Sequence, residues 1–460
     1  MGKNTIFCFR LFCFNAIFIF CTVPASTAQI SISKKGTFTH PSWSGQSNIY
    51  EVNLRQYTPS SSMKDFEKSL PRLKKMGVDI LWFMPITPIG IEDRKASGSE
   101  LGSYYAARDY KAVNPEFGTM DDWKKLVRHA HSMGFKVITD WMANHSSPDN
   151  HWMKDHPGFY AKDSAGNYIS PFDWTDTRKL NYANNELRDS MIEAMAFWLK
   201  ESDIDGFRCD VADGPPVDFW KQCIDSLKKI KHVFMLAESQ NPELHVAGFD
   251  ETYTWAIMEG FIHFYAGKLT LAQVDSIINN NIQVFPKDAY RLYFTTNHDW
   301  NSWEGTEFER YGDAYKALAV FTQTMYQSVP LIYSGQEIPN KKRIKFFVKD
   351  PIVWNNYNMA PFYSTFLHLR KKNPALAADA SYKKLVTAND VAVFAYVREK
   401  AGHKVAVILN LSKEPQQFSI KDPSVYGNPM NVFLGAKEKV NATHIFSMEP
   451  WGFTVYDYDK

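Results

Sequence analysis

Cysteine is scarce in this chain outside its first residues. Five cysteines occur among the 460 residues. Cys8, Cys13 and Cys21 lie near the N-terminus, which leaves Cys209 and Cys223 for all the rest. A fold held together by several disulfides is therefore excluded. The formal net charge is also small, at +2, so the chain lacks the basic surface that nucleic-acid-binding proteins need. We expect no nucleic acid among its partners.

Long apolar runs are absent apart from one near the N-terminus. Lys3 and Arg10 precede an apolar run over 11–23, and small residues follow this run up to Ala28. This layout is typical of a secretory signal peptide, and the run is too short to span a membrane. We expect a signal peptide over 1–28 that is cleaved near Ala28. The mature protein would be secreted or periplasmic, with no transmembrane segment after signal removal.

The same segment allows a second interpretation. Cys21 could accept a lipid, but Phe20 precedes it where a small residue is expected, so lipoprotein anchoring is the less favoured reading. Two of the 52 basic residues and none of the 50 acidic residues lie in the signal. Its removal would leave a neutral protein.

Aromatic residues, by contrast, are abundant. They make up 15% of the chain, with 13 Trp, 23 Tyr and 33 Phe. A flat side chain can stack on the apolar face of a sugar ring, so this surplus suits a carbohydrate-binding cleft. Any single aromatic residue is still better explained as part of the core.

Apolar runs of strand length alternate with helical patterns along most of the chain. Strands are predicted over 49–57, 80–86, 136–140, 205–210, 233–238, 248–252, 291–298 and 331–335. Helices are predicted over 63–76, 120–133, 186–200, 217–230, 271–279, 312–327 and 362–371. Eight strands that alternate with helices predict an α/β fold, a (β/α)8 TIM barrel.

Two further regions flank this pattern. The polar stretch 141–184 follows the third strand and is interpreted as a loop-built insertion over the active face. Short β runs begin near Ala378 and predict a C-terminal antiparallel β-sandwich. The predicted domains are a signal peptide over 1–28, a barrel with its insertion over 29–377, and a β domain over 378–460.

Charged residues stand at the ends of three predicted strands. Arg208 and Asp210 lie two residues apart, on one face of the strand 205–210, while Glu238 and Asp299 end two later strands. Buried charges are costly unless they are paired or used in chemistry. Because the active site of a TIM barrel lies at the carboxyl ends of its strands, these acids predict a catalytic cluster.

Four segments carry a resemblance to a known family. They are 140–145 (DWMANH), 205–210 (DGFRCD), 237–239 (AES) and 296–299 (TNHD). In order and spacing they resemble the signature segments of glycoside hydrolase family 13, the α-amylase family. The segment 330–337 (PLIYSGQE) and a Tyr-Tyr pair at 104 and 105 resemble it further.

The resemblance implies roles for individual residues. Asp210 corresponds to the nucleophile, Glu238 to the acid/base and Asp299 to a third catalytic carboxylate; a retaining glycosidase needs a carboxylate nucleophile and a carboxylic acid. Arg208 corresponds to the nucleophile's electrostatic partner. The positions that the resemblance implies for substrate binding are Tyr105, His145, Arg208 and His298. Tyr104 is an alternative to Tyr105, although the spacing to Asp109 favours Tyr105.

Departures from the family pattern bear on metal binding and specificity. Asp213 and Gly214 stand where many endo-acting amylases have Lys-His, and Lys179 stands where a calcium-binding carboxylate is frequent. Asn144 alone cannot hold calcium, which takes six to eight oxygen ligands. We therefore expect no metal ligand and no cofactor. Calcium is the one metal ion whose binding needs to be tested.

The predicted function is that of a secreted retaining α-glucan hydrolase cleaving α-1,4-glucosidic bonds in starch or maltooligosaccharides. The resemblance also allows a cyclomaltodextrinase or neopullulanase, an α-glucosidase, or a transglycosylase, because these share fold and catalytic residues. A non-catalytic glucan-binding protein is the alternative of another class. The oligomeric state is left open by the sequence.

Overall fold

The structure, a computed structural model, describes residues 39–94 and 101–459. The predicted signal peptide lies outside these residues. No helix in the described part of the chain is long and apolar enough to cross a membrane.

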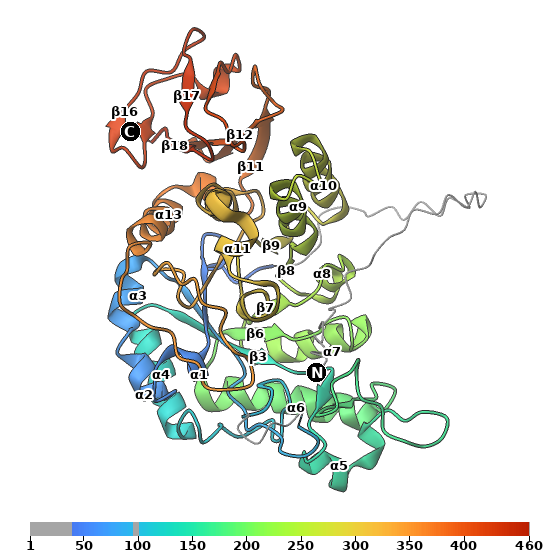
Figure 1. Ribbon diagram of the computed structural model, residues 1–460. Helices are drawn as coiled ribbons and strands as arrows, with labels where there is room; N and C mark the ends of the chain where they lie inside the picture. Colours follow the sequence, from blue (N-terminus) through green and yellow to red (C-terminus); the bar gives the residue numbers. More distant parts are fainter. Residues whose placement is uncertain (1–38, 95–100, 460) are drawn as a thin grey trace, which may run out of the picture.

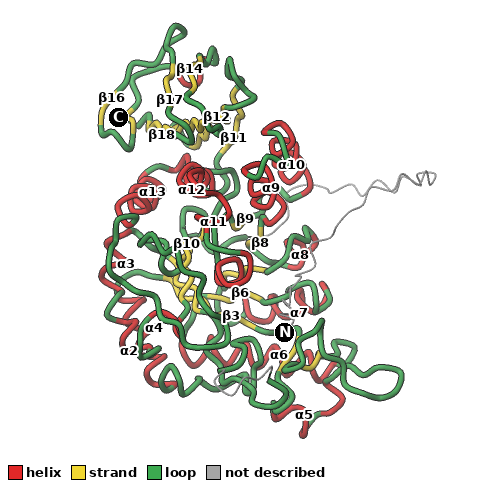
Figure 2. Tube along the Cα trace, viewed as in Figure 1, coloured by secondary structure: helices red, strands yellow, loops and turns green. Residues whose placement is uncertain are grey.

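Eight parallel strands form the centre of the molecule, with helices around them (Figures 1 and 2). The strands are β1 (Ile49–Val52), β2 (Ile80–Phe83), β3 (Lys136–Trp141), β6 (Gly206–Cys209), β7 (Phe234–Ala237), β8 (Glu251–Tyr253), β9 (Tyr290–Leu292) and β10 (Leu331–Tyr333). The order β10-β1-β2-β3-β6-β7-β8-β9 follows the chain apart from β10, which pairs with β1.

The last gap closes through backbone hydrogen bonds beyond β9. Leu331 N–H donates to the carbonyl of Tyr293 (3.0 Å), and Val329 N–H donates to that of Arg291 (3.3 Å). The predicted (β/α)8 TIM barrel is confirmed.

The barrel interior changes character along the strands. Near the amino ends, Ile49, Ile80 and Ile138 belong to one buried apolar cluster. Side chains alternate across a strand, so the same inward faces carry Glu51 and Asp140 two residues later. Apolar packing therefore supports one end of the barrel, and the other end collects polar groups.

Helices cover the outside of the barrel. They are α1 (Leu54–Tyr57), α2 (Met63–Glu67), α3 (Leu70–Met76), α4 (Met120–Ser132), α6 (Asn185–Ser202), α7 (Val217–Lys228), α8 (Glu243–Ala247), α9 (Trp255–Tyr265), α10 (Leu271–Val284), α11 (Glu307–Tyr311), α12 (Tyr315–Thr324) and α13 (Ala360–Lys372). The sequence did not predict α8, α9 or α11, because each is short or lies in a stretch without clear periodicity.

Several predicted boundaries were wrong, and three elements show the reasons. The strand predicted over 49–57 ends at Val52 and the chain continues as α1, while the strand predicted over 291–298 ends at Leu292. The helix predicted over 63–76 is two helices, α2 and α3, because a proline near the start of α3 cannot donate the hydrogen bond that a continuous helix would need.

The insertion and the C-terminal domain extend from opposite sides of the barrel in Figure 1. The insertion contains β4 (His145–Ser146), α5 (His151–Asp155) and β5 (Arg178–Lys179), so it holds short regular elements as well as loops. The C-terminal domain has a six-stranded antiparallel sheet whose first strand, β11, spans Ser381–Leu385. Its other strands are β12 (Val393–Lys400), β13 (His403–Asn410), β15 (Met430–Asn431), β16 (Ala436–Lys437) and β18 (Phe453–Asp457).

A two-stranded ribbon covers one face of this sheet. It consists of β14 (Gln416–Phe418) and β17 (Phe446–Met448). Phe418 and Phe446 from the ribbon join Val397 and Ile408 from the sheet in one buried cluster. The predicted antiparallel C-terminal domain is confirmed.

Candidate active site

Arg208 is the centre of the polar cluster at the carboxyl ends of the strands. Its Nη1 donates to Asp140 Oδ1 (2.9 Å) and to Asp210 Oδ1 (2.8 Å). Its Nη2 lies 2.8 Å from Glu238 Oε1, an ion pair whose angle falls outside that of a hydrogen bond. The guanidinium is fully buried. Three carboxyl groups from β3, the end of β6 and the end of β7 thus share one cation.

Because three carboxyl groups face a single cation, their pKa values differ from those of isolated carboxyl groups. Burial raises the pKa of Asp210, and the negative charges of Glu238 and Asp140 raise it further, while Arg208 opposes both effects. Burial likewise raises the pKa of Asp140 to about 6 against the effect of Arg208. The cluster therefore keeps a proton at a pH where isolated carboxyl groups have lost theirs.

The backbone after β6 holds Glu238 from a second side. Val211 N–H donates to Glu238 Oε2 (2.8 Å). Val211 has a φ of 42°, in the left-handed region that a β-branched residue avoids at a cost of about 1–3 kcal/mol. Glu238 remains 14% exposed, so a carboxyl held from two directions still faces the solvent.

A second group of contacts surrounds His298. Its Nε2 lies 2.7 Å from the Tyr105 hydroxyl and 3.2 Å from Asp299 Oδ2. The Tyr105 hydroxyl also donates to Asp140 Oδ2 (3.1 Å), and its ring stacks on His298. Tyr104 points elsewhere and accepts from Gln56. The geometry therefore favours Tyr105 over Tyr104 as the aromatic residue of this site.

Asp299 is the most exposed carboxylate of the cluster, at 26% of its side chain. Burial acts to raise its pKa, but the charge of His298 and the hydrogen bond from that ring outweigh burial and lower it. Asp299 is therefore the group that stays ionised beside the protonated cluster around Arg208.

His145 lies in the same region with a different environment. Burial lowers its pKa to about 4, so the ring is neutral at physiological pH. Its Nδ1 lies 3.2 Å from the Asn144 amide nitrogen. Its Nε2 has no hydrogen-bond partner among the described residues. A neutral imidazole with one unused nitrogen can bond to a ligand hydroxyl.

Aromatic side chains extend from His145 into the insertion. Trp174 lies edge-on to His145 (5.3 Å between ring centroids) and against Phe172 (4.7 Å). Phe172 is 64% exposed and has a φ of 53°, in a turn where Trp174 N–H donates to the carbonyl of Pro171 (3.1 Å). An exposed aromatic ring in a strained turn offers a flat surface to solvent or ligand.

A second aromatic group adjoins Tyr105. Phe346 stacks near Tyr105 (6.2 Å) and contacts Trp303 (5.4 Å). Phe347 contacts both Phe346 and Trp303. Two aromatic groups from different loops therefore adjoin the site, one through His145 and the other through Tyr105. Trp141, by contrast, is 1% exposed and packs in the core.

The residues at the family's calcium position do not fit that ion. The carbonyl of Asn144 already accepts from Leu180 N–H (3.1 Å), and a Cβ at Gly214 would lie 2.0 Å from the Asn144 amide oxygen. Lys179 pairs with His145 across β4 and β5. No group of three or more His, Cys, Asp or Glu side chains within 39–94 and 101–459 could hold a metal. Calcium needs several carboxylates, and this place supplies none.

Two buried residues of the site were missed by the sequence analysis. Glu51 on β1 lies 2.5 Å from His298 Nδ1, and the Tyr253 hydroxyl on β8 lies 3.3 Å from Arg208 Nε. Glu51 could have been found by the signal that revealed Arg208, which is a charge inside an apolar strand. Tyr253 has no such signal, because tyrosine is common in strands.

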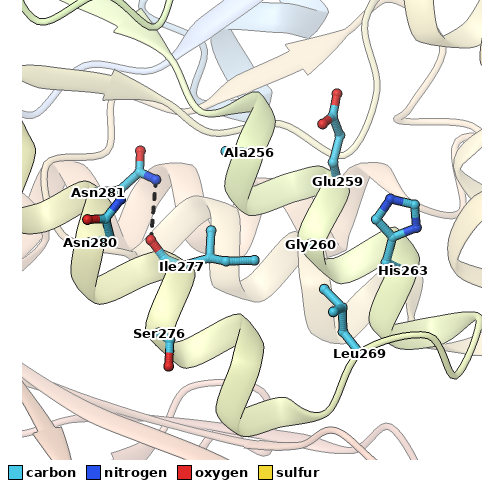
Figure 3. Close-up of a pocket in the computed structure, with 9 residues that line it drawn as sticks. All are labelled: Ala256, Glu259, Gly260, His263, Leu269, Ser276, Ile277, Asn280 and Asn281. Atoms are coloured by element: carbon cyan, nitrogen blue, oxygen red, sulfur yellow. Dashed lines mark hydrogen bonds between the residues drawn. The ribbon is translucent and has the colours of Figure 1, made fainter. Parts of the chain in front are cut away.

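A separate surface cavity of about 470 Å³ lies between α9 and α10 (Figure 3). Glu259 and His263 line it from α9, and Asn280 and Asn281 line it from α10. The Asn281 side chain donates to the carbonyl of Ile277 (3.3 Å). None of the clustered carboxylates lines this cavity, so the strand ends remain the candidate active site.

Comparison with known proteins agrees with this geometry. A family model described as the α-amylase catalytic domain matches residues 62–172 and 159–359, more than half of the chain and every clustered acid except Glu51. The chain belongs to the α-amylase family. This family is glycoside hydrolase family 13, and the chain is a glycoside hydrolase.

Individual members of the family cover most of the chain. α-Amylase MalA of Haloarcula japonica is 25% identical over 413 residues, which are 85% of this chain but 59% of the relative. Neopullulanase 2 of Thermoactinomyces vulgaris is 24% identical over 463 residues, 86% of this chain and 74% of the relative. The crystal structure of the maltogenic α-amylase AmyB of Thermotoga neapolitana superposes with a TM-score of 0.82 at 27% identity, covering 90% of this chain and 99% of AmyB.

Proposed function

We propose that this chain hydrolyses α-1,4-glucosidic bonds in starch or maltooligosaccharides with retention of the anomeric configuration. The observation that carries the proposal is that Asp210 and Glu238 flank one guanidinium, that of Arg208. A retaining glycosidase needs its two carboxyl groups about 5 Å apart, and a shared cation draws two carboxyl groups together.

In the reactive form, Asp210 is ionised and Glu238 carries the proton. Asp210 attacks the anomeric carbon while Glu238 protonates the departing glycosidic oxygen, which leaves a glycosyl ester on Asp210. Glu238, now a carboxylate, then removes a proton from water. The water oxygen attacks the same carbon and releases Asp210. Two inversions at one carbon give net retention.

The remaining residues act on the sugar at the cleavage point. Asp299 and His298 hold its hydroxyls, and the charge of Asp299 stabilises the positive charge that develops on the ring. His145 contributes its unused nitrogen to another hydroxyl. Tyr105 supplies the stacking surface.

The anomer of the first product tests the mechanism. Proton NMR of maltoheptaose cleavage should show the α-anomer before mutarotation. Asp210→Asn should abolish the signal, and Asp205→Asn, at the other end of the same strand, is the matched control that should keep it. A β-anomer as first product, or full activity of Asp210→Asn, contradicts the proposal.

The aromatic groups support a linear α-glucan as substrate. Phe172 with Trp174 on one side and Trp303 with Phe346 on the other can each stack a glucose unit of a chain that passes Tyr105. Starch and maltoheptaose should therefore be cleaved faster than maltose, pullulan or cyclodextrin. Chromatography of the products over time measures this order. Preferred cleavage of cyclodextrin or pullulan would assign the chain to the cyclomaltodextrinase or neopullulanase type instead.

Export is proposed from the N-terminal 28 residues. Cleavage near Ala28 would release the enzyme to the periplasm or medium, where polymeric glucan is available. N-terminal sequencing of the protein from each cell fraction tests this. A mature N-terminus at Cys21 with an attached lipid would show membrane anchoring instead.

A further inference from the structure

A buried carboxylate lies directly behind His298. Glu51 is 0% exposed, and its Oε1 lies 2.5 Å from His298 Nδ1. On β1 it is the neighbour of Trp82 on one strand and of Tyr333 on the other. Its Oε2 has no hydrogen-bond partner in the described part of the chain. A position that served packing alone would be better filled by an apolar residue, as Ile49 shows two residues earlier.

The opposite nitrogen of the same ring faces the cleft. His298 Nε2 contacts the Tyr105 hydroxyl (2.7 Å) and Asp299 Oδ2 (3.2 Å). An imidazole donates from both nitrogens only when it is doubly protonated. With Glu51 accepting at Nδ1, the doubly protonated ring donates from Nε2 to the Tyr105 hydroxyl and lies within ion-pair distance of Asp299. Glu51 and Asp299 are therefore joined through one histidine.

We propose that Glu51 is a positioning residue for glycoside cleavage. It keeps His298 doubly protonated and in one ring orientation, so that Nε2–H faces the Tyr105 hydroxyl, Asp299 and the sugar hydroxyl bound beside them. This inference rests on the proposed function, because it assigns Glu51 a part in that same reaction. Glu51 itself touches no substrate, since it lies behind the ring.

The charges around the ring favour this state. Apart from Glu51 and Asp299, the polar groups near it are the Tyr105 hydroxyl and Asp140 on β3, and the Trp82 ring lies nearly at right angles to it. Arg208 on β6 acts on both Glu51 and Asp299. Burial lowers the pKa of His298, but the charges of Asp299 and Glu51 and their hydrogen bonds outweigh burial and raise it well above the ordinary value. Removing either Glu51 or Asp299 should therefore lower the pKa of His298, so that the ring loses its second proton more readily.

Glu51→Gln is the decisive variant, because glutamine has the same shape and can still accept from Nδ1 but carries no charge. Glu251→Gln is the matched control. Glu251 on β8 is also 0% exposed, and neither of its carboxylate oxygens has a hydrogen-bond partner among the described residues. Its nearest charges are Arg370, Asp250 and Arg291 rather than the clustered acids.

The first readout is kcat/KM on maltoheptaose as a function of pH. Glu51→Gln should lower it by about 10- to 100-fold, the range expected when the partner that orients a functional histidine is removed. The alkaline limb of the profile reports proton loss from both Glu238 and His298, and it should move to lower pH because His298 loses its second proton earlier. Glu51→Asp keeps the charge, so its alkaline limb should stay near that of the wild type. Glu251→Gln should match the wild type in both respects.

The second readout needs no substrate. The proton between Glu51 and His298 should give a downfield proton NMR signal that persists unchanged in Glu251→Gln and moves upfield in Glu51→Gln, where the acceptor is a neutral amide. A folded Glu51→Gln protein with wild-type rate and an unmoved alkaline limb overturns the inference, as does a wild-type spectrum without that signal. A wild-type protein that has the signal but cleaves no α-glucan refutes the proposed function and leaves the contact between Glu51 and His298 in place.

Discussion

Two aspartates flank strand β6, and their surroundings are opposite in character. Asp205, at the amino end, accepts from Val137 N–H (2.9 Å) and contacts His131 (2.7 Å) and Lys231 (3.1 Å). Burial acts to raise its pKa, but these partners outweigh burial and hold it at about 2. Asp210, at the carboxyl end, shares a single arginine with two other acids, and its pKa is raised.

The two aspartates lie only five residues apart, yet Asp205 serves stability and Asp210 serves catalysis. At the amino end each charge meets opposite charges and hydrogen-bond donors, so ionisation of Asp205 stabilises the fold. At the carboxyl end like charges are collected, so ionisation of Asp210 costs stability. A cluster of this kind is retained for its chemistry, because packing alone would favour apolar residues there.

The largest expected effect is on the activity of Asp210→Asn. Loss of the nucleophile should lower kcat by at least about 1,000-fold, since removing one member of a catalytic unit removes most of its effect. The melting temperature should stay equal or rise, because one of three clustered acids is neutralised. Kinetics on maltoheptaose and scanning calorimetry test both. A fall in the melting temperature of several degrees would mean that the cluster is a stabilising element after all.

Arg208→Lys should come next in size. A lysine is a point charge without the planar fork of arginine, so it cannot contact Asp140, Asp210 and Glu238 together. We expect kcat to fall by about 100-fold and the free energy of unfolding to fall by about 3 kcal/mol, since buried acids lose their partner. Urea unfolding and steady-state kinetics measure the two losses. If Arg208→Lys keeps both the wild-type kcat and the wild-type free energy of unfolding, the fork shape of the guanidinium is not needed to hold the three acids.

Asp205→Asn should lose stability and keep its activity, the opposite of what we expect for Asp210→Asn. The folded-state pKa of Asp205, about 2, lies below its ordinary value of 3.8. Its stabilisation is therefore fully present above about pH 4 and is lost as the pH falls towards 2. At pH 7 the variant should lose about 2 kcal/mol of unfolding free energy and keep its kcat.

The control for this prediction is to compare the unfolding free energies of wild type and Asp205→Asn at low pH. The unfolding free energies of wild type and Asp205→Asn in urea should draw together as the pH falls towards 2, where about half of the wild-type carboxyl is protonated in the folded protein. A difference that persists unchanged at that pH would assign the effect to lost hydrogen bonds rather than to charge.

Metal removal should have the smallest effect. Because Lys179 and Gly214 leave no carboxylate set beside Asn144, chelation with EDTA should change neither the activity nor the melting temperature. Calorimetry with EDTA and with added calcium chloride tests this. A rise in the melting temperature with calcium would reveal a site built from other residues.

Much of this site could be predicted from the sequence, for a local reason. Asp210, Glu238 and Asp299 each end an apolar run, and strand ends in a barrel converge. Arg208 could be paired with Asp210 from the two-residue spacing alone. The role of Tyr105 could not be separated from that of Tyr104, because the choice depends on which hydroxyl reaches Asp140.

Boundaries were harder, because they depend on tertiary contacts. The run 49–57 reads as one strand, but only its first four residues lie within the sheet as β1. Arg55, which is fully buried, then pairs with Glu116 and stacks on Tyr104, and no local pattern reveals these contacts. The helices α8 and α9 were missed for a related reason, since packing rather than periodicity maintains them.

The sequence by itself determined the (β/α)8 architecture, the order of the strands and the acids at their ends. These depend on hydrophobic runs and on spacing along the chain, which are local properties. Only the tertiary structure decided that Arg208 would serve three carboxyl groups, that Glu51 would stand behind His298 and that Asp205 and Asp210 would have opposite acidities. Those outcomes depend on which charges from distant segments meet in the protein interior, where charges act on one another more strongly than they do in water.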